Sequence, residues 1–331
     1  MTGRVKYNYG TAIRAAFEYL LENHPEVFVI GQGLWSPWYV GNTMTDLDKK
    51  FGKERIIDTP VSEAGTTGVA IGASIFGSRP IVVHPRIDFM LYALDPIVNQ
   101  AAKWSHMFGS QTHPSVTIRA IINRGGEQGA QHSQSLHAWL AHTPGLRVLM
   151  PYSVADARDM LVASVLCDDP VIYIDDRWLY EDEDILEPIK EYKIDEFTPK
   201  VLKHGEDITI VSSSYSTKLA MDASNELDKE GLGAEVIDLR TLNPFNPEKI
   251  IDSVSKTRNL LVLDGGTRNA SFACEVITSV MEIIDFTTMK NNPKRITLCD
   301  APAPTSKSLE EVYYPNVNEI IEQVKSMTSD N

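Results

Sequence analysis

Glu63 is the first residue whose type and position suggest chemistry, because it directly precedes a run of small residues. Residues 56–83 read IIDTPVSEAGTTGVAIGASIFGSRPIVV. With Ser62, the acid could simply favour the start of a helix, where it contributes about 0.3–1 kcal/mol. If instead the small-residue helix packs closely against a partner, burial favours the protonated carboxyl. Glu63 would then share a proton with a nitrogen heterocycle.

His132 is the second residue of this kind. It lies in GAQHSQSLHAWLAH, residues 129–142, in a polar loop that we expect to lead into a helix. Lone histidines are usually surface or hydrogen-bonded core groups, but polar neighbours on a loop beyond a buried strand favour a catalytic role. By contrast, Gly31-Gln32-Gly33 lacks the third glycine of the GxGxxG pattern and indicates a turn after a strand.

Strands and helices alternate along the first half of the chain. Apolar runs predict strands over residues 27–31, 80–83, 116–122 and 170–174. Helical spacing predicts helices over 9–24, 64–77, 89–104 and 155–166, with Pro96 confined to a turn or kink. This order predicts an α/β fold with a parallel sheet covered on both faces and a site at the carboxyl ends of its strands.

A charged segment with two prolines separates this half from a second α/β unit. We expect a first domain over residues 1–185, a linker over 186–203 and a second domain over 204–331. In the second domain, the predicted strands span 208–212, 234–239 and 259–264, and the predicted helices span 216–231, 247–257 and 270–284.

Composition excludes several classes of function. The net charge of −14 over 331 residues argues against a protein that binds nucleic-acid phosphates. The three cysteines are widely spaced and no CxxC or HExxH pattern occurs, so we expect neither a zinc site nor a disulfide framework. No signal peptide and no apolar run of membrane-spanning length is found, which favours a cytoplasmic protein that binds no membrane.

Several segments together resemble one family. SEAG with GVAIGASIFGSRPIV, DFMLYALDPIVNQAAKW, AQHSQS and AEVIDLRTLNPFNPEKIIDSVSKT are similar, in this order, to the beta subunit of the thiamine-diphosphate-dependent decarboxylase component of 2-oxo acid dehydrogenases. This group includes the pyruvate and branched-chain enzymes and belongs to the wider transketolase-like family. The resemblance covers nearly the whole chain. It implies two three-layer α/β domains, a pyrimidine-binding domain and a transketolase C-terminal domain.

The resemblance also implies roles for individual residues. Glu63 corresponds to the glutamate that hydrogen-bonds the aminopyrimidine ring of thiamine diphosphate and promotes formation of the reactive ylid. Phe89 corresponds to the aromatic residue that stacks on the pyrimidine, although ordinary core packing is the alternative. His132 corresponds to the active-site histidine that contacts the substrate or the covalent intermediate. Gln32 stands beside the cofactor, where the family normally has an acid.

A missing motif points to a partner subunit. Enzymes of this class hold Mg²⁺ and the diphosphate with a Gly-Asp-Gly segment, which this chain lacks; Asp264-Gly265-Gly266 has the wrong order. The resemblance therefore implies that an alpha subunit binds the diphosphate and supplies most of the Mg²⁺ coordination, in an α2β2 heterotetramer. A lipoyl acyltransferase core is a further partner that the family allows. No metal ligand is expected in this chain itself.

Other departures from the family bear on the substrate. The chain reads His84-Pro85-Arg86 before Phe89, and it has Arg124 upstream of His132. These groups favour an anionic or hydroxylated ligand over the methyl group of pyruvate, or they pair with acids of the alpha subunit. The loop VLCDDP is one residue shorter than the loop that binds a structural K⁺ in some members, so that ion is left open.

Three functions remain open from the sequence. The first is a beta subunit that decarboxylates a 2-oxo acid and passes the acyl group to a lipoyl domain. The second is the beta half of a two-subunit transketolase-like enzyme that transfers a two-carbon unit to a sugar or aldehyde, which Arg86 and Gln32 favour. The third is a non-catalytic scaffold subunit, against which the intact Glu63, Phe89 and His132 argue.

Overall fold

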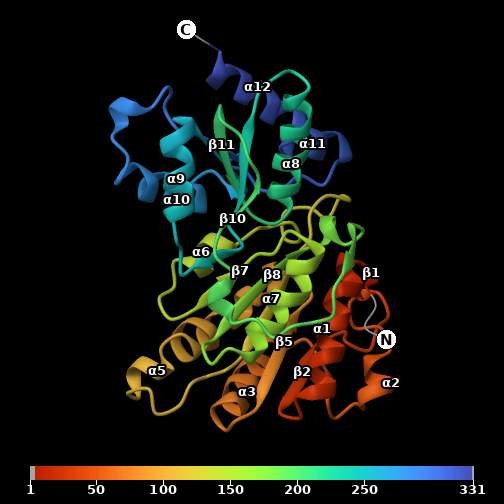
Figure 1. Cartoon of the computed structure of the whole chain (residues 1–331). Coiled ribbons are helices and arrows are strands. Elements are labelled where there is room, and N and C mark those ends of the chain that lie inside the picture. The colour runs from red at the N-terminus through yellow and green to blue at the C-terminus, as the bar shows by residue number, and fades with distance from the viewer. Residues whose placement is uncertain (1–3, 330–331) are drawn as a thin grey trace. The chain divides into compact units, whose positions relative to one another are not determined.

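A computed structural model describes residues 4–329 (Figure 1). The chain forms two compact units. The first unit runs up to Asn123 and includes Trp139–Glu196; the second comprises Arg124–Ala138 and the chain from Phe197 onward. The segment that carries His132 therefore belongs to the second unit, although it lies between elements of the first in the sequence.

A parallel sheet forms the centre of the first unit. Its strands are in the order β7-β8-β6-β5-β2-β4, and each neighbouring pair is parallel. Every residue of β6 and β8 is buried, as expected for parallel strands that are covered on both faces. The four strands predicted from the apolar runs are thus confirmed as β2, β5, β6 and β8, whereas β4 and β7 were not predicted. The strands are β2 (Val27–Gln32), β4 (Ile56–Thr59), β5 (Arg79–His84), β6 (Thr117–Ile122), β7 (Arg147–Leu149) and β8 (Val171–Asp176).

Three long helices of this unit agree with the predictions. These are α1 (Tyr9–Asn23), α3 (Glu63–Ile75) and α7 (Val154–Leu166). A capping box between Asn8 and Thr11 starts α1, because the Asn8 side chain accepts a hydrogen bond from the Thr11 backbone N–H and the Thr11 hydroxyl accepts one from the Asn8 N–H. The second of the three, α3, packs against β5 and so brings Glu63 to the sheet.

The helix predicted over residues 89–104 is broken. The chain instead forms α4 (Ile87–Met90), a 3₁₀ turn η1 (Leu91–Ala93), a π-helical segment η2 (Pro96–Ala101) and α5 (Trp104–Met107). Pro96 opens η2, where its missing N–H leaves no hydrogen bond unmade. The kink predicted at Pro96 is thus confirmed, but the single helix is not.

Several short elements were not predicted. At the end of the expected first domain, β9 (Glu183–Leu186) pairs antiparallel with β1 (Val5–Asn8). The remaining short elements are β3 (Tyr39–Asn42), α2 (Leu47–Phe51), α6 (His137–Ala141), η3 (Arg177–Leu179), η4 (Ile194–Glu196), β13 (Thr241–Asn243) and η5 (Phe286–Thr288).

The second unit contains a five-stranded sheet in the order β10-β12-β11-β14-β15. The edge strand β10 (Lys200–Lys203) is antiparallel to its neighbour, and the other pairs are parallel. The predicted strands appear as β11 (Ile208–Ser212), β12 (Ala234–Asp238) and β14 (Leu260–Thr267), and both β10 and β15 (Lys294–Leu298) are additional. The helices are α8 (Tyr215–Asp228), α9 (Glu248–Thr257), α10 (Phe272–Met281), α11 (Lys307–Tyr313) and α12 (Val317–Thr328), of which the last two were not predicted.

None of the helices within residues 4–329 combines the length and the apolar character that crossing a bilayer requires.

Candidate functional site

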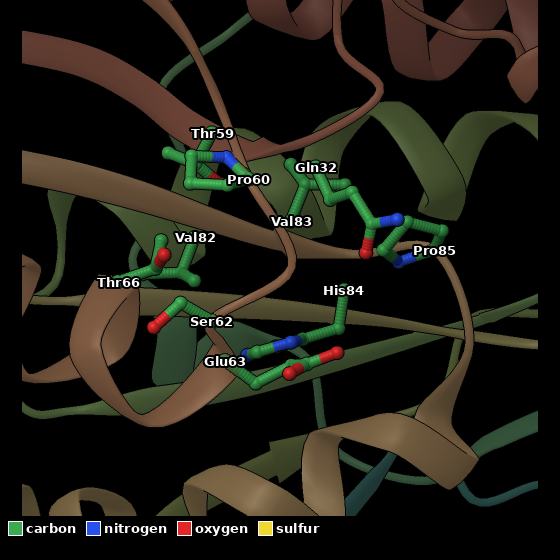
Figure 2. Close-up of a pocket in the computed structure, with 11 residues that line it drawn as sticks. Gln32, Thr59, Pro60, Ser62, Glu63, Thr66, Val82, Val83, His84 and Pro85 are labelled. Atoms are coloured by element: carbon green, nitrogen blue, oxygen red, sulfur yellow. The ribbon is translucent and has the colours of Figure 1, made fainter.

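A pocket lies where β2, β4 and β5 end and α3 begins (Figure 2). About 240 Å³ of space without protein atoms lies here, a volume that includes open solvent. Its lining residues are Gly31, Gln32, Thr59, Pro60, Ser62, Glu63, Thr66, Val82, Val83, His84 and Pro85.

Three of the residues singled out from the sequence line this pocket: Gln32, Glu63 and His84. They come from different elements but lie close together, because β2 and β5 are parallel neighbours whose carboxyl ends meet at one edge of the sheet. Their convergence supports a site at that edge.

Glu63 is the first residue of α3 and is half-buried. Ser62 makes no side-chain cap, whereas Glu63 lies in the first turn of α3, so the alternative of a helix-start role holds for Glu63 alone. Within residues 4–329, no hydrogen bond or ion pair engages the Glu63 carboxylate. The acid is therefore held at the pocket by its helix and remains available to a ligand.

Close contact between two strands shapes the floor of the pocket. A Cβ atom on Gly31 would lie 2.4 Å from the carbonyl oxygen of Val83 on β5, so only glycine fits at this point of β2. The turn expected after this strand begins at Gly33, whose φ is +72°. Asp58 fixes it, since its Oδ1 accepts hydrogen bonds from the N–H groups of Gly33 (2.6 Å) and Leu34 (3.3 Å).

Gln32 is the last residue of β2, and its amide is already oriented. Its Nε2 donates a hydrogen bond of 2.9 Å to the hydroxyl of Tyr39. The side-chain oxygen of Gln32 is thereby turned away from the tyrosine, which leaves a neutral acceptor at the pocket.

His84 ends β5 and is buried. Its Nε2 lies 3.2 Å from the hydroxyl of Thr67 on α3. Desolvation lowers the pKa of His84 to about 4, so the imidazole is neutral near pH 7. Figure 2 shows the imidazole in the same part of the pocket as Glu63. His84 therefore adds polarity to the pocket without adding charge.

Two further predicted residues follow the pocket in sequence but do not line it. Arg86 comes directly after the lining residue Pro85, and Phe89 lies on α4. Phe89 is half-buried, and its backbone N–H donates to the carbonyl of Arg86. The assignment of Phe89 to a stacking role stays a prediction.

His132 and Arg124 belong to the second unit. The backbone N–H of His132 donates to the carbonyl of Gly129, which closes a turn. Arg124 is buried, with its guanidinium next to Gly265 and about 6.0 Å from the ring of Tyr215. Their roles likewise stay predictions.

A buried pair that sequence reasoning missed anchors this segment. His137 Nε2 lies 2.9 Å from Oδ1 of Asp264, and its Nδ1 lies 2.9 Å from the hydroxyl of Ser135. Asp264 also accepts hydrogen bonds from the N–H groups of Gly266 and Ala273. The segment before α6 is thus tied to the end of β14. The only sequence signal was an acid after a buried strand, a pattern that identifies no particular partner for the acid.

The loop after α7 is occupied by an arginine. Arg79 Nη1 donates to the carbonyl oxygens of Val165 (3.0 Å) and Cys167 (2.8 Å), and Nη2 pairs with Asp168. The Arg79 guanidinium thus already donates hydrogen bonds to these carbonyl oxygens, in the loop where binding of a structural K⁺ was left open. Among the described residues, no cluster of three histidine, cysteine, aspartate or glutamate side chains has a metal-binding arrangement.

Known proteins share both the domains and the full length of this chain. Residues 5–182 match the family described as "Transketolase, pyrimidine binding domain", and residues 198–320 match "Transketolase, C-terminal domain". The pyruvate dehydrogenase E1 component subunit beta of Rickettsia felis is 34% identical over 318 residues, 96% of each chain. The corresponding protein of Rhizobium meliloti is 33% identical over 96% of this chain and 68% of its own length. A mitochondrial subunit beta-2 of Oryza sativa is 34% identical over 95% of this chain and 84% of its own.

A solved structure supports the fold. The split gene transketolase, described as an inactive beta4 tetramer, superimposes with a TM-score of 0.76 over 98% of both chains. Its sequence is 20% identical, so the similarity concerns the fold alone.

Proposed function

Because the chain belongs to the family of beta subunits of thiamine-diphosphate-dependent 2-oxo acid dehydrogenases, we propose that it is the beta subunit of a heteromeric enzyme that decarboxylates a 2-oxo acid and passes the acyl group to a lipoyl domain. The relatives at 33–34% identity are pyruvate dehydrogenase subunits, whereas the transketolase match is limited to the fold. Two-carbon transfer to a sugar or aldehyde is therefore not favoured.

The observation that carries the proposal is the unengaged carboxylate of Glu63 in the pocket. Thiamine diphosphate, when bound, supplies a carbon nucleophile and accepts the electron pair that loss of CO₂ leaves behind. Glu63, which lines the pocket, offers a group that can hold a proton at a nitrogen of the pyrimidine ring. The helix start keeps this acid in place.

Other residues of the chain complete the binding of the ring. Gln32 offers the ring its side-chain oxygen as a neutral acceptor. We assign Phe89 to stacking on the ring and His132 to contact with the substrate. Arg86, His84 and Arg124 are assigned to the substrate side, where cations and imidazole suit an anionic ligand.

An exposed helix face supports an alpha subunit as the partner. Beyond Glu63, α3 exposes Val69 (64%) and is followed by the exposed Phe76 (93%), and a Cβ on Gly68 or Gly72 would meet no atom within 4 Å. Apolar surface of this kind is typical of a subunit interface. We propose that the alpha subunit covers this face, binds Mg²⁺ and the diphosphate, and forms an α2β2 heterotetramer. A lipoyl acyltransferase core is the proposed acceptor.

We assign the protein to the cytoplasm. The Oryza sativa relative carries the word mitochondrial in its name, so the compartment needs its own test. Fractionation of cells that express a tagged full-length chain, with a matrix and a cytosolic marker, separates the two compartments; recovery with the matrix marker would contradict the assignment.

The decisive experiment is a reconstitution. The chain is co-purified with a candidate alpha subunit from the same organism, supplied with thiamine diphosphate and Mg²⁺, and assayed with a panel of 2-oxo acids. Lipoyl-domain and sugar-aldehyde acceptors are tested in parallel. We expect acyl-lipoyl product. Ketose product would support the transferase instead, and an absence of cofactor-dependent turnover would indicate a scaffold subunit.

A further inference from the structure

We propose that Arg86 and Arg177 form an anion subsite beside the pocket, and that its ligand is a carboxylate or phosphate group of the substrate. This inference rests on the proposed function, because it takes the pocket to be the place of catalysis. It adds Arg177 to the site and states which group of the substrate the two arginines bind.

Both arginines are connected to residues that line the pocket. Arg86 directly follows the lining residue Pro85. Arg177 starts η3 immediately after β8, and its Nη2 donates a 2.5 Å hydrogen bond to the carbonyl of Tyr39. The hydroxyl of Tyr39 in turn accepts a hydrogen bond from the lining residue Gln32. The two guanidinium groups therefore lie at the same edge of the sheet as Glu63.

Each guanidinium contains a buried N–H group without a partner. Within residues 4–329, Nη1 of Arg86 and Nε of Arg177 are shielded from solvent and make no hydrogen bond. An unsatisfied buried donor costs about 1–3 kcal/mol, and more when it is charged. Native proteins rarely keep such donors unless a ligand or a functional role accounts for them.

The electrostatics of the pair point to an anion. Burial, and next to it the charge of Arg177, lower the pKa of Arg86, and the opposing effects of Asp88 and Tyr39 do not offset them. Two cations that repel each other in a partly desolvated place are stabilised when an anion binds between them. The fork of a guanidinium matches the oxygens of a carboxylate or a phosphate, which a point charge does not.

The subsite is tested by ligand-dependent stability of the isolated full chain. Inorganic phosphate and pyruvate are titrated separately at constant ionic strength set with chloride, and the thermal midpoint is followed. We compare Arg86→Gln and Arg177→Gln with Arg14→Gln, a matched control. Arg14 is also a half-buried arginine of the first unit, but its guanidinium is paired with Thr45 and Glu18.

We expect a saturable rise of the midpoint in the wild type and in Arg14→Gln. The apparent affinity for at least one of the two anions should fall tenfold or more in Arg86→Gln and in Arg177→Gln. Arg86→Lys and Arg177→Lys keep the charge and should give intermediate affinities. They test the subsite if a glutamine variant fails to fold. A response to phosphate alone or to pyruvate alone identifies the substrate group.

Two results would overturn the subsite. One is a rise of the thermal midpoint with anion concentration that is absent from the wild type, or that is equal in the wild type and in every variant. The other is a pair of observations: the co-purified wild-type complex does not bind the anion, and Arg86→Gln weakens association of the subunits. Together they would show that an acidic side chain of the partner pairs with the arginines. Cofactor-dependent turnover is measured in parallel. Turnover without anion binding refutes only the subsite, and anion binding without turnover refutes only the proposed function.

Discussion

His84 Nε2 lies 3.2 Å from the hydroxyl of Thr67, one turn into the helix that begins with Glu63. The contact joins the end of β5 to α3 at the pocket. It also buries an ionisable ring with a single hydroxyl as its hydrogen-bond partner among the described residues. Two properties of the site follow, a fixed position for α3 and a sensitivity to acid.

The first prediction concerns pH. The folded pKa of His84 is about 4, below its ordinary value of 6.5. Between these values the unfolded chain binds a proton that the folded chain does not, so folding stability decreases as the pH falls from about 6.5 to about 4. The shift corresponds to a loss of about 3 kcal/mol. His84→Gln should reduce this loss, measured as thermal midpoints at pH 7 and pH 4.5, whereas a substitution at the exposed His106 should not. Identical pH profiles for all three chains would contradict the assignment.

The second prediction separates the isolated chain from the assembled enzyme. Gly68 lies inside α3 with open space where a Cβ would be, so Gly68→Ala should stabilise the isolated chain by about 1 kcal/mol through helix propensity. The same methyl group should weaken association with the alpha subunit if that subunit packs on this face.

Thermal midpoints of the isolated chain and sedimentation of the mixture measure the two effects. Thr278→Ala, at an exposed position of α10, serves as a control that gains propensity without touching the α3 face. Unchanged association of Gly68→Ala would remove α3 from the proposed interface.

The third prediction concerns the anchor of the segment that carries His132. Burial by itself raises the pKa of Asp264, but His137 and two backbone N–H groups outweigh it, so the pKa lies below its usual value. This contribution to stability is present above the unfolded pKa and is lost as the pH falls through the folded one. Asp264→Asn should destabilise the chain by about 3 kcal/mol at pH 7.

Urea denaturation measures this loss, and hydrogen exchange of residues 124–138 should accelerate in the variant. The control is Asp222→Asn, at an exposed site on α8, which should change stability by no more than about 0.5 kcal/mol. Native exchange rates in Asp264→Asn would show that His137 is held by other contacts.

Periodicity predicted the long elements well because their apolar residues repeat at the period of the element. The helices α1, α3 and α7 and the strands β6 and β8 are examples. The short edge strands β1 and β9 were missed, since they bury only part of their residues and depend on each other for pairing. The break at η1 and η2 was foreseen only as a kink at Pro96.

The candidate site was predicted in part. Glu63, Gln32 and His84 come together because neighbouring parallel strands end at one edge, which is a rule of the fold. The pairing of His137 with Asp264 joins positions 127 residues apart in sequence, and no local pattern encodes it. Arg177 was missed for the same reason, since its relation to Arg86 exists only after β8 and β5 have taken their places in the sheet.

The most direct test of the account is proton exchange at the thiazolium carbon of thiamine diphosphate in the assembled complex, followed by NMR in D₂O. Glu63→Gln preserves the shape of the side chain but cannot hold the proton, and it should slow exchange by roughly 10²-fold or more while the subunits still assemble. His132→Ala should leave this exchange near the wild-type rate and slow the steps that involve substrate. Exchange at the wild-type rate in assembled Glu63→Gln would contradict the central claim.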